Sequence, residues 1–457
     1  MGRKTKWLSS VLDVPSRNRQ AVRVAVLADS DTRWKWGALT ARRIAPDDRP
    51  VELSGYLLRG RATPTARQLA EVGAEADTLR EVTGTAFLRT LSDQAESDRP
   101  YDLVVLALVG GAVQAMLHGT AALRLEHRPV IVTGYVGVVY EKLSDGLLLR
   151  HGADVVLANS RYDAERFRAV YEGVGADASS VTEAALPFLG GAPYAPEAGR
   201  ETVVFAAQPS VPVTRADRTY LVRRLVEHAR LHPHREVLLK LRSKVGEHTT
   251  HVEEFPYQRL VEKVPGGPPP NFRLVHGNMG EVLDRTDLLV TVSSTAALES
   301  LHRGIPTAVL TDFGIREPLG NHHFLGSGCL ASWDELDGGG MPSPDPVWAA
   351  RQGVAPDGSY ATAFDQARER VTKLLDGPEP PPVSPYYTAT TAPGSLPGLL
   401  ARYHLAADGT PLTTRPAESE PSGIRRVVRE AVRGAARGAY RHGVQRVAPV
   451  IRRMGEL

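Results

Sequence analysis

The chain has 457 residues, one cysteine and a formal net charge of +3. This length predicts two or three domains, the near-neutral charge argues against a nucleic-acid partner, and the single Cys329 excludes a disulfide framework. No run approaches the 18 apolar residues of a spanning helix, and the N-terminal "MGRKTKWLSS" lacks the apolar segment of a signal peptide. We therefore expect a cytoplasmic protein in a reducing compartment.

The first half of the chain alternates short apolar runs with helical stretches. The predicted strands are 22–28, 101–108, 128–134 and 153–160, and the predicted helices are 64–82, 84–98 and 160–173. Uninterrupted β-branched runs of this length are typical of strands buried on both faces of a parallel sheet. After an N-terminal extension at 1–19, residues 20–190 are therefore expected to form one Rossmann-like α/β domain.

The pattern restarts after a linker at 191–201. Strands are predicted at 202–208, 235–241, 272–277, 287–294 and 305–312, with a helix at 217–231. A second parallel-sheet domain is thus expected over 202–376, followed by a proline-rich linker at 377–422 and a basic helix at 423–457. Ligands of open parallel sheets bind beyond the carboxyl ends of the strands, so we expect the site in a cleft between the two domains.

The segment "LLVTVSSTAALESLHRGIP" contains the first candidate site. Ser293, Ser294 and Thr295 end a predicted strand and open a helix, where hydroxyl and backbone N–H groups either bind an anion or simply cap the helix. Glu299 lies one turn further along the same face. Its carboxylate either accepts ribose hydroxyls or forms an ordinary surface salt bridge.

A second candidate cluster follows the predicted strand 235–241. Its members are Lys240, Arg242, Lys244, Glu247 and His248. Cations this close together either bind an anion, such as a nucleotide phosphate or a carboxylated sugar, or form a solvated basic loop. The lysine within an apolar strand favours the anion site, because a buried lysine requires a partner. No set of zinc ligands is evident, and we expect neither a metal ion nor a cofactor.

The spacing of Glu299, Gly304 and Pro306 resembles the nucleotide-binding half of GT-B glycosyltransferases, a pattern that UDP-sugar epimerases share. The resemblance spans about residues 20–376 and implies that the glutamate holds the ribose while the residues before it hold the phosphates. The two strand-end clusters also resemble those of bacterial sialyltransferases, polysialyltransferases and capsule-type transferases. Those transferases carry a Lys-x-His-Pro-like element after one of these strands. In this chain the pair His232-Pro233 instead precedes the predicted strand 235–241. As a whole, the chain resembles an uncharacterised actinobacterial glycosyltransferase family.

The first domain is expected to hold the acceptor and the catalytic base. Asp29 and Asp31 follow the first strand and Asp145 follows a later one, and the sequence does not decide among these three carboxylates. Trp34 and Trp36 either stack on a sugar or pack between the domains. In the second domain, Asn321 and His322 either line the cleft or belong to a structural loop.

The C-terminal block 423–457 carries arginines every four residues: Arg425, Arg429, Arg433, Arg437 and Arg441. Such a stripe repels itself, and anionic lipid headgroups would relieve the repulsion. The alternatives are a helix packed on the protein or a mobile tail. Together these features predict a glycosyltransferase at the inner face of the membrane. It would move a sugar from a nucleotide-activated donor, for example a CMP-linked acidic sugar, to a polysaccharide or lipid-linked acceptor. The competing hypotheses are a sugar-nucleotide epimerase and a non-catalytic glycan-binding module.

Overall fold

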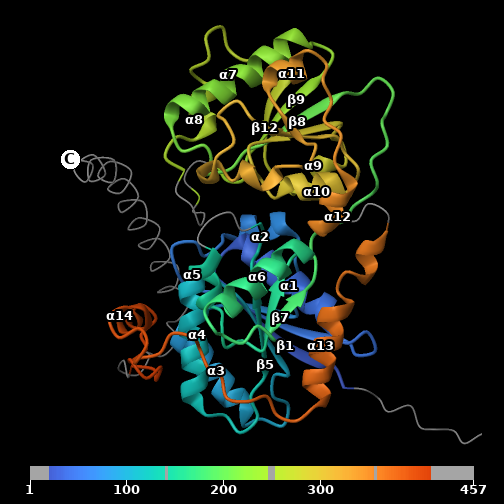
Figure 1. Ribbon diagram of the computed structural model, residues 1–457. Helices are drawn as coiled ribbons and strands as arrows, with labels where there is room; N and C mark the ends of the chain where they lie inside the picture. Colours follow the sequence, from blue (N-terminus) through green and yellow to red (C-terminus); the bar gives the residue numbers. More distant parts are fainter. Residues whose placement is uncertain (1–19, 139–142, 245–246, 248–252, 355–357, 413–457) are drawn as a thin grey trace, which may run out of the picture.

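The computed structural model describes residues 20–138, 143–244, 247, 253–354 and 358–412. Within this part of the chain the strands form two sheets, each entirely parallel. Figure 1 shows the two sheets in two stacked domains, with α2 (Ala66–Val72) and α10 (Ala296–His302) at the boundary between them. The predicted α/β class and GT-B architecture are confirmed. The predicted basic helix at 423–457 lies outside the described residues.

The first sheet has the order β3-β2-β1-β4-β5-β6-β7. Its strands are β1 Val22–Ala28, β2 Val51–Leu58, β3 Thr78–Val82, β4 Leu103–Ala107, β5 Val130–Gly134, β6 Val155–Ala158 and β7 Val181–Glu183. The helices between them are α1 Asp31–Ile44, α2, α3 Gly84–Ala95, α4 Gly110–Leu123, α5 Leu143–Leu148 and α6 Arg161–Gly173. The strand order reverses direction between β1 and β4, so their carboxyl ends form the usual ligand crevice of such a sheet.

The second sheet has the order β10-β9-β8-β11-β12-β13. Its strands are β8 Thr202–Ala206, β9 Glu236–Lys240, β10 Phe272–Val275, β11 Leu288–Thr291, β12 Thr307–Leu310 and β13 Leu330–Ala331. Its helices are α7 Arg215–Leu231, α8 Tyr257–Val261, α9 Met279–Leu283, α10, α11 Trp333–Asp337 and α12 Pro346–Arg351. The same reversal lies between β8 and β11, which places Arg242 and Ser294 at one edge of the sheet.

One predicted helix is wrong in its second half. The segment 64–82 forms α2 only as far as Val72, and Gly73 ends the helix with a left-handed φ of 62°. The remainder contains β3, an edge strand that is exposed at four of its five positions. An exposed edge strand has no buried face, so it lacks the apolar alternation by which a strand is recognised in a sequence.

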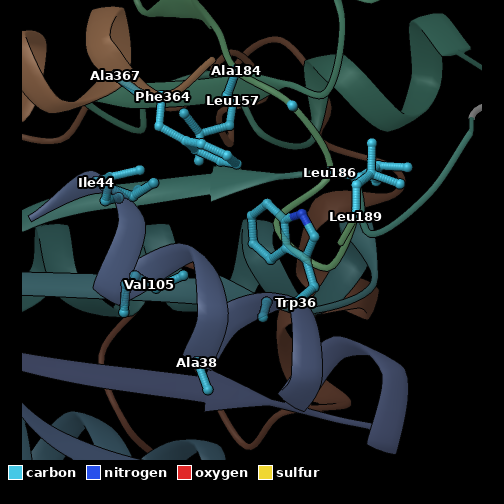
Figure 2. Close-up of a cluster of buried hydrophobic side chains, with 14 of the residues drawn as sticks. Trp36, Ala38, Ile44, Val105, Leu157, Ala184, Leu186, Leu189, Phe364 and Ala367 are labelled. Atoms are coloured by element: carbon cyan, nitrogen blue, oxygen red, sulfur yellow. The ribbon is translucent and has the colours of Figure 1, made fainter. Parts of the chain in front are cut away.

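The C-terminal part of the described chain returns to the first domain. Helix α13 (Asp365–Asp376), expected to close the second domain, packs against α1, β5, β6 and β7. Figure 2 shows Phe364 and Ala367 beside Leu157 and Ala184 of the first domain. The boundary predicted at 376 therefore lies too late, because the chain crosses between the domains before α13.

The proline-rich segment after α13 is also more than a linker. Val383 and, from α14 (Leu396–Ala401), Leu396 and Leu400 are buried in the core of the first domain. His118 hydrogen-bonds the carbonyl of Tyr387 through Nε2 at 2.9 Å. These contacts anchor the segment on the first sheet, although its composition predicts no element of its own.

Apolar packing continues from one domain into the other. Trp36, Leu186 and Leu189 of the first domain (Figure 2) share one buried cluster with Leu298 and Leu301 of α10. Trp34 and Trp36 are fully buried, and their indole N–H groups donate to a carbonyl and to an amide oxygen inside the first domain. Both are core residues, so neither presents a ring face for stacking on a sugar.

Candidate functional site

The carboxyl ends of β9 and β11 lie at the same edge of the second sheet. Lys240 is the last residue of β9 and Arg242 follows it, while Ser293 and Ser294 follow β11. Only β8 separates the two strands, and neighbouring strands are about 4.8 Å apart, so the two strand ends lie about 10 Å apart. This brings together the two clusters that the sequence analysis singled out.

Lys240 is buried, with 8% of its surface exposed, and its ammonium group donates to the carbonyl of Leu241 at 2.8 Å. Burial lowers the pKa of Lys240 to about 8, and the nearby carboxylates of Glu71 and Glu299 partly oppose this shift. Among the described residues no carboxylate lies within ion-pair distance of its Nζ atom. Such a lysine gains more than an exposed one from an anion that binds beside it.

Arg242 reaches across the domain boundary. Its Nη2 atom lies 2.8 Å from Asp31 Oδ1 and 2.5 Å from Thr32 Oγ1, at the start of α1 in the first domain. Arg242 follows β9 of the second sheet, and Asp31 follows β1 of the first sheet. The carboxyl ends of these two strands therefore face each other. The guanidinium group is therefore paired with a carboxylate in this structure.

A second ionic contact crosses the boundary beside the first. Arg67 of α2 donates to both oxygens of Glu247 and also to Glu71. Its hydrogen bonds to Glu247 raise the pKa of Arg67. Asn278 donates to the carbonyl of Glu71 at 3.0 Å. Glu247 thus holds the domains together. Lys244 is exposed, and only its backbone N–H contacts Glu247, at 2.8 Å.

The corner 293–295 is fastened from several sides. Ser293 donates its hydroxyl to the carbonyl of Leu319 at 2.5 Å, and its backbone N–H donates to Gln208 at 3.0 Å. Ser294 Oγ accepts from the N–H of Ala296 at 3.3 Å, which is a local capping bond. Thr295 makes no side-chain capping bond. Its hydroxyl faces the first domain, because a Cβ atom at Gly137 would lie only 2.9 Å from Thr295 Oγ1.

Glu299 is a buried carboxylate on α10, with 8% of its surface exposed. Burial raises its pKa, and the positive charges of Lys35, Arg303 and Lys240 act in the opposite direction. Lys35 belongs to α1, one turn after Asp31. One face of α1 therefore presents a carboxylate toward Arg242 and an ammonium group toward Glu299, so the two domains meet with complementary charges.

The three candidate bases have different surroundings in the structure. Asp29 Oδ2 accepts from the N–H of Val109 at 3.0 Å and Oδ1 pairs with Arg33 at 2.9 Å, so Asp29 ties the ends of β1 and β4 together. Asp31 contacts the second domain through Arg242. Asp145 lies on α5 and is exposed. Asp31 is therefore the one of the three that lies beside the cations of the second domain.

Asn321 belongs to its own loop. It is fully buried, its Oδ1 accepts from the N–H of Arg316 at 2.9 Å, and its Nδ2 donates to the carbonyls of Leu310 and Gly314 at 3.1 and 2.9 Å. These bonds use the whole amide, so Asn321 supports the loop and the predicted ligand contact is wrong. His322 follows it, half-buried, in the same 3₁₀ helix, η2 Asn321–Phe324. His248 lies outside the described residues.

Asn321→Ala is expected to lower the free energy of unfolding by about 2–3 kcal/mol, because three backbone groups lose their buried partner. Urea denaturation measures this loss. Nucleotide affinity of the folded variant, measured by calorimetry, is expected to equal that of the wild type. A variant that is fully stable, or one that folds but binds nucleotide more weakly, would contradict the structural role.

Sequence reasoning missed Lys35, Arg67, Glu71 and Gln208. Lys35 follows Asp31 by four residues, and this spacing alone could have placed both side chains on one helix face. Arg67 and Glu71 carry no local signal, because their role depends on how the two domains meet. Gln208 bridges the ends of β8 and β11 through Ser293, with its Nε2 3.2 Å from Ser293 Oγ. Only the pairing order of the strands reveals that contact.

The family model described as "Putative glycosyltransferase (DUF6716)" matches residues 24–374. The chain belongs to this family. The match begins in β1 and ends in α13, so it covers both sheets and the whole edge described above. No curated protein matches the chain.

Solved structures of similar fold share little sequence with the chain. The UDP-GlcNAc 2-epimerase of Methanocaldococcus jannaschii has a TM-score of 0.47 and 9% identity, over 78% of this chain and 100% of the epimerase. The same enzyme from Neisseria meningitidis, bound to UDP-GlcNAc, has a TM-score of 0.45 and 10% identity, over 77% and 98%. UGT2 of Phytolacca americana, complexed with UDP-2-fluoroglucose and pterostilbene, has 0.44 and 10%, over 78% and 94%.

Proposed function

We propose that this chain is a glycosyltransferase that takes its sugar from a nucleotide-activated donor bound at the carboxyl edge of the second sheet. The observation that carries the proposal is the position of Lys240 and Arg242. Lys240 ends β9 and Arg242 follows two residues later, with only β8 between β9 and the strand that leads to the Ser293–Thr295 corner. Arg242 contacts the first domain through Asp31. A buried ammonium group without a carboxylate partner among the described residues, next to a guanidinium group, suits a phosphate group.

The reaction explains why these charges are needed. Glycosyl transfer releases a nucleoside phosphate, and negative charge develops on its oxygen as the bond to the sugar breaks. Lys240 and Arg242 would neutralise that charge without a metal ion, and preorganised charges of this kind are a large part of catalysis. Glu299, one turn into α10, would accept the ribose hydroxyls of the donor.

Asp31 would serve as the base that takes the proton of the acceptor hydroxyl. In this structure it is paired with Arg242 at 2.8 Å. A donor phosphate that binds Arg242 would replace this carboxylate and leave it beside the sugar, where a base is required. Asp29 and Asp145 are the less favoured candidates, because the first is bound to Val109 and Arg33 and the second is exposed.

The two cations at this edge also bear on the classes of donor and acceptor. Two cations suit a second phosphate or the carboxylate of an acidic sugar such as a CMP-linked one. The acceptor would be a polysaccharide of the cell surface or its lipid-linked precursor, reached from the cytoplasmic face of the membrane. Among the described residues no helix is both long and apolar enough to cross a membrane.

A thermal-shift screen with UDP, GDP, CDP, CMP and TDP tests the proposal. We expect one base to raise the melting temperature well above the others, followed by transfer from the matching nucleotide sugar. Conversion of that nucleotide sugar in the absence of any acceptor would instead identify an epimerase. No response to any nucleotide would leave a glycan-binding module and overturn the transferase.

Deletion of residues 423–457 is expected to abolish co-sedimentation with vesicles that contain anionic lipid. Each arginine near such a surface contributes about 1 kcal/mol, and this segment carries five of them at four-residue intervals. Vesicles of neutral lipid are the control and are expected to bind neither form. Equal binding of the intact and shortened chains would contradict a membrane role for the segment.

A further inference from the structure

A compact group of metal-ligand side chains lies in the second domain, away from the edge that faces the first. It consists of His228 on α7, His232 at the C-cap of α7, and Asp337 at the end of α11. Figure 1 shows α7 and α11 side by side, far from the domain boundary, and the two helices are in contact. His232 precedes β9 whereas Lys240 ends it, so the length of the strand, about 13 Å, separates this group from the proposed donor site.

Each of the three side chains offers one ligand atom, and these atoms lie within 4.8 Å of one another. His228 is fully buried, and its Nδ1 atom lies 2.6 Å from Asp337 Oδ1. These two atoms face each other where α7 and α11 are in contact, so an ion between them would contact both. The Nε2 atom of His228 is buried and has no hydrogen-bond partner among the described residues.

His232 brings a second imidazole to the same place. It follows His228 by four residues, so both rings project from one face of the helix end, and their centroids are 4.5 Å apart. Its Nε2 atom is also buried without a hydrogen-bond partner in the described part of the chain. A neutral imidazole nitrogen is the form that binds a metal ion.

The surrounding charges leave room for a cation. Arg224 contacts Asp337 at 2.9 Å but also pairs with Asp334 at 2.7 Å. Arg235 pairs with Glu201 at 2.7 Å. Each of the two nearby arginines thus has a carboxylate partner outside the three proposed ligands. The C-terminal end of α7 adds partial negative charge from its carbonyl groups.

We propose that His228, His232 and Asp337 bind one divalent transition-metal ion, with Zn²⁺ as the best-suited ion. Two imidazoles and a carboxylate are a common ligand set for Zn²⁺, with water as the fourth ligand. Bonds of about 2.0–2.2 Å in tetrahedral geometry require ligand atoms about 3.4 Å apart. His228 Nδ1 and Asp337 Oδ1, now 2.6 Å apart, would therefore separate by about 1 Å to admit the ion. The ion would join α7 to α11 and stabilise the second domain, without a part in sugar transfer.

Calorimetry on the full-length, untagged chain tests this site. The protein is freed of metal by dialysis against a chelator and titrated with ZnCl₂, and the absorption of bound Co²⁺ reports the ligand geometry. We expect one ion per chain and a melting temperature that rises with zinc concentration. His232→Gln and Asp337→Asn are each expected to weaken zinc binding by more than about tenfold.

The matched control is His234→Gln, because His234 is an exposed neighbour that pairs with Glu201 at 3.3 Å. It is expected to leave zinc affinity unchanged. His228 is fully buried, so the half-buried His232 is the preferred position for a variant that folds. Absence of saturable binding, or zinc binding that survives His232→Gln, would overturn the proposal. Nucleotide binding is measured in parallel and is expected to be independent of zinc.

Discussion

Arg242→Ala is expected to weaken nucleotide binding by about 10- to 150-fold, which corresponds to about 1.5–3 kcal/mol. The guanidinium group is the proposed partner of the donor phosphate, and hydrogen bonds between charged groups lie at the upper end of the usual range. Calorimetric titration with the nucleotide that the thermal-shift screen selects measures the loss. Lys244→Ala is the matched control, because Lys244 is a cation of the same loop but is exposed.

A second variant separates two roles of Arg242. The residue also joins the domains through Asp31, at 2.8 Å, so a loss of binding could follow from loosened domains alone. Asp31→Asn breaks the same ion pair without removing the cation. If Arg242 holds the phosphate, Asp31→Asn is expected to bind nucleotide as well as the wild type or better, while sugar transfer falls. Equal losses of nucleotide binding in both variants would refute the phosphate role.

Lys240→Met is expected to stabilise the fold and weaken nucleotide binding at the same time. The pKa of Lys240 falls from 10.5 to about 8 on folding, so at pH 7 its charge costs about 3 kcal/mol of stability. Between these two pKa values the unfolded chain binds more protons, so the wild type gains stability as the pH rises from about 8 to 10.5. The methionine variant lacks this gain. Urea denaturation of both proteins at matched pH values measures the difference.

The same pKa predicts how binding depends on pH. Below about pH 8 the ammonium group is charged and available to the phosphate, and above it the charge is lost. Wild-type affinity is therefore expected to fall by more than about tenfold between about pH 7 and pH 9.5. Lys240→Met is expected to bind weakly at both values. Wild-type affinity that is constant over this range would show that Lys240 does not meet the phosphate.

Much of the fold can be predicted from the sequence. Runs such as 24–28 and 103–108 are apolar throughout, because a strand between two helical layers is buried on both faces. Such runs reveal the strands, and their alternation with helices reveals the parallel sheets. Edge strand β3 and the return of α13 to the first domain could not be predicted in this way. Their positions depend on partners that are distant in the sequence.

The sequence predicts which residue types form the candidate site, but it predicts the role of each residue only in part. Lys240 and Arg242 stand out as cations at the end of an apolar strand, and Ser293 to Thr295 stand out as hydroxyls at a helix start. The hydrogen bonds in the structure show that some residues of the predicted site have a structural role. Ser293 is bound to Leu319 and Gln208, and Asn321 is bound entirely to its own loop.

The sequence by itself determined the two α/β halves and the chemistry at their strand ends, because strand burial and local residue type are properties of short segments. Only the tertiary structure decided that Arg242 meets Asp31, that Lys35 acts on Glu299, and that His228, His232 and Asp337 gather in one place. Each of these contacts joins segments far apart in the chain. They form because of the strand order and the packing of the domains, and no local sequence pattern predicts either.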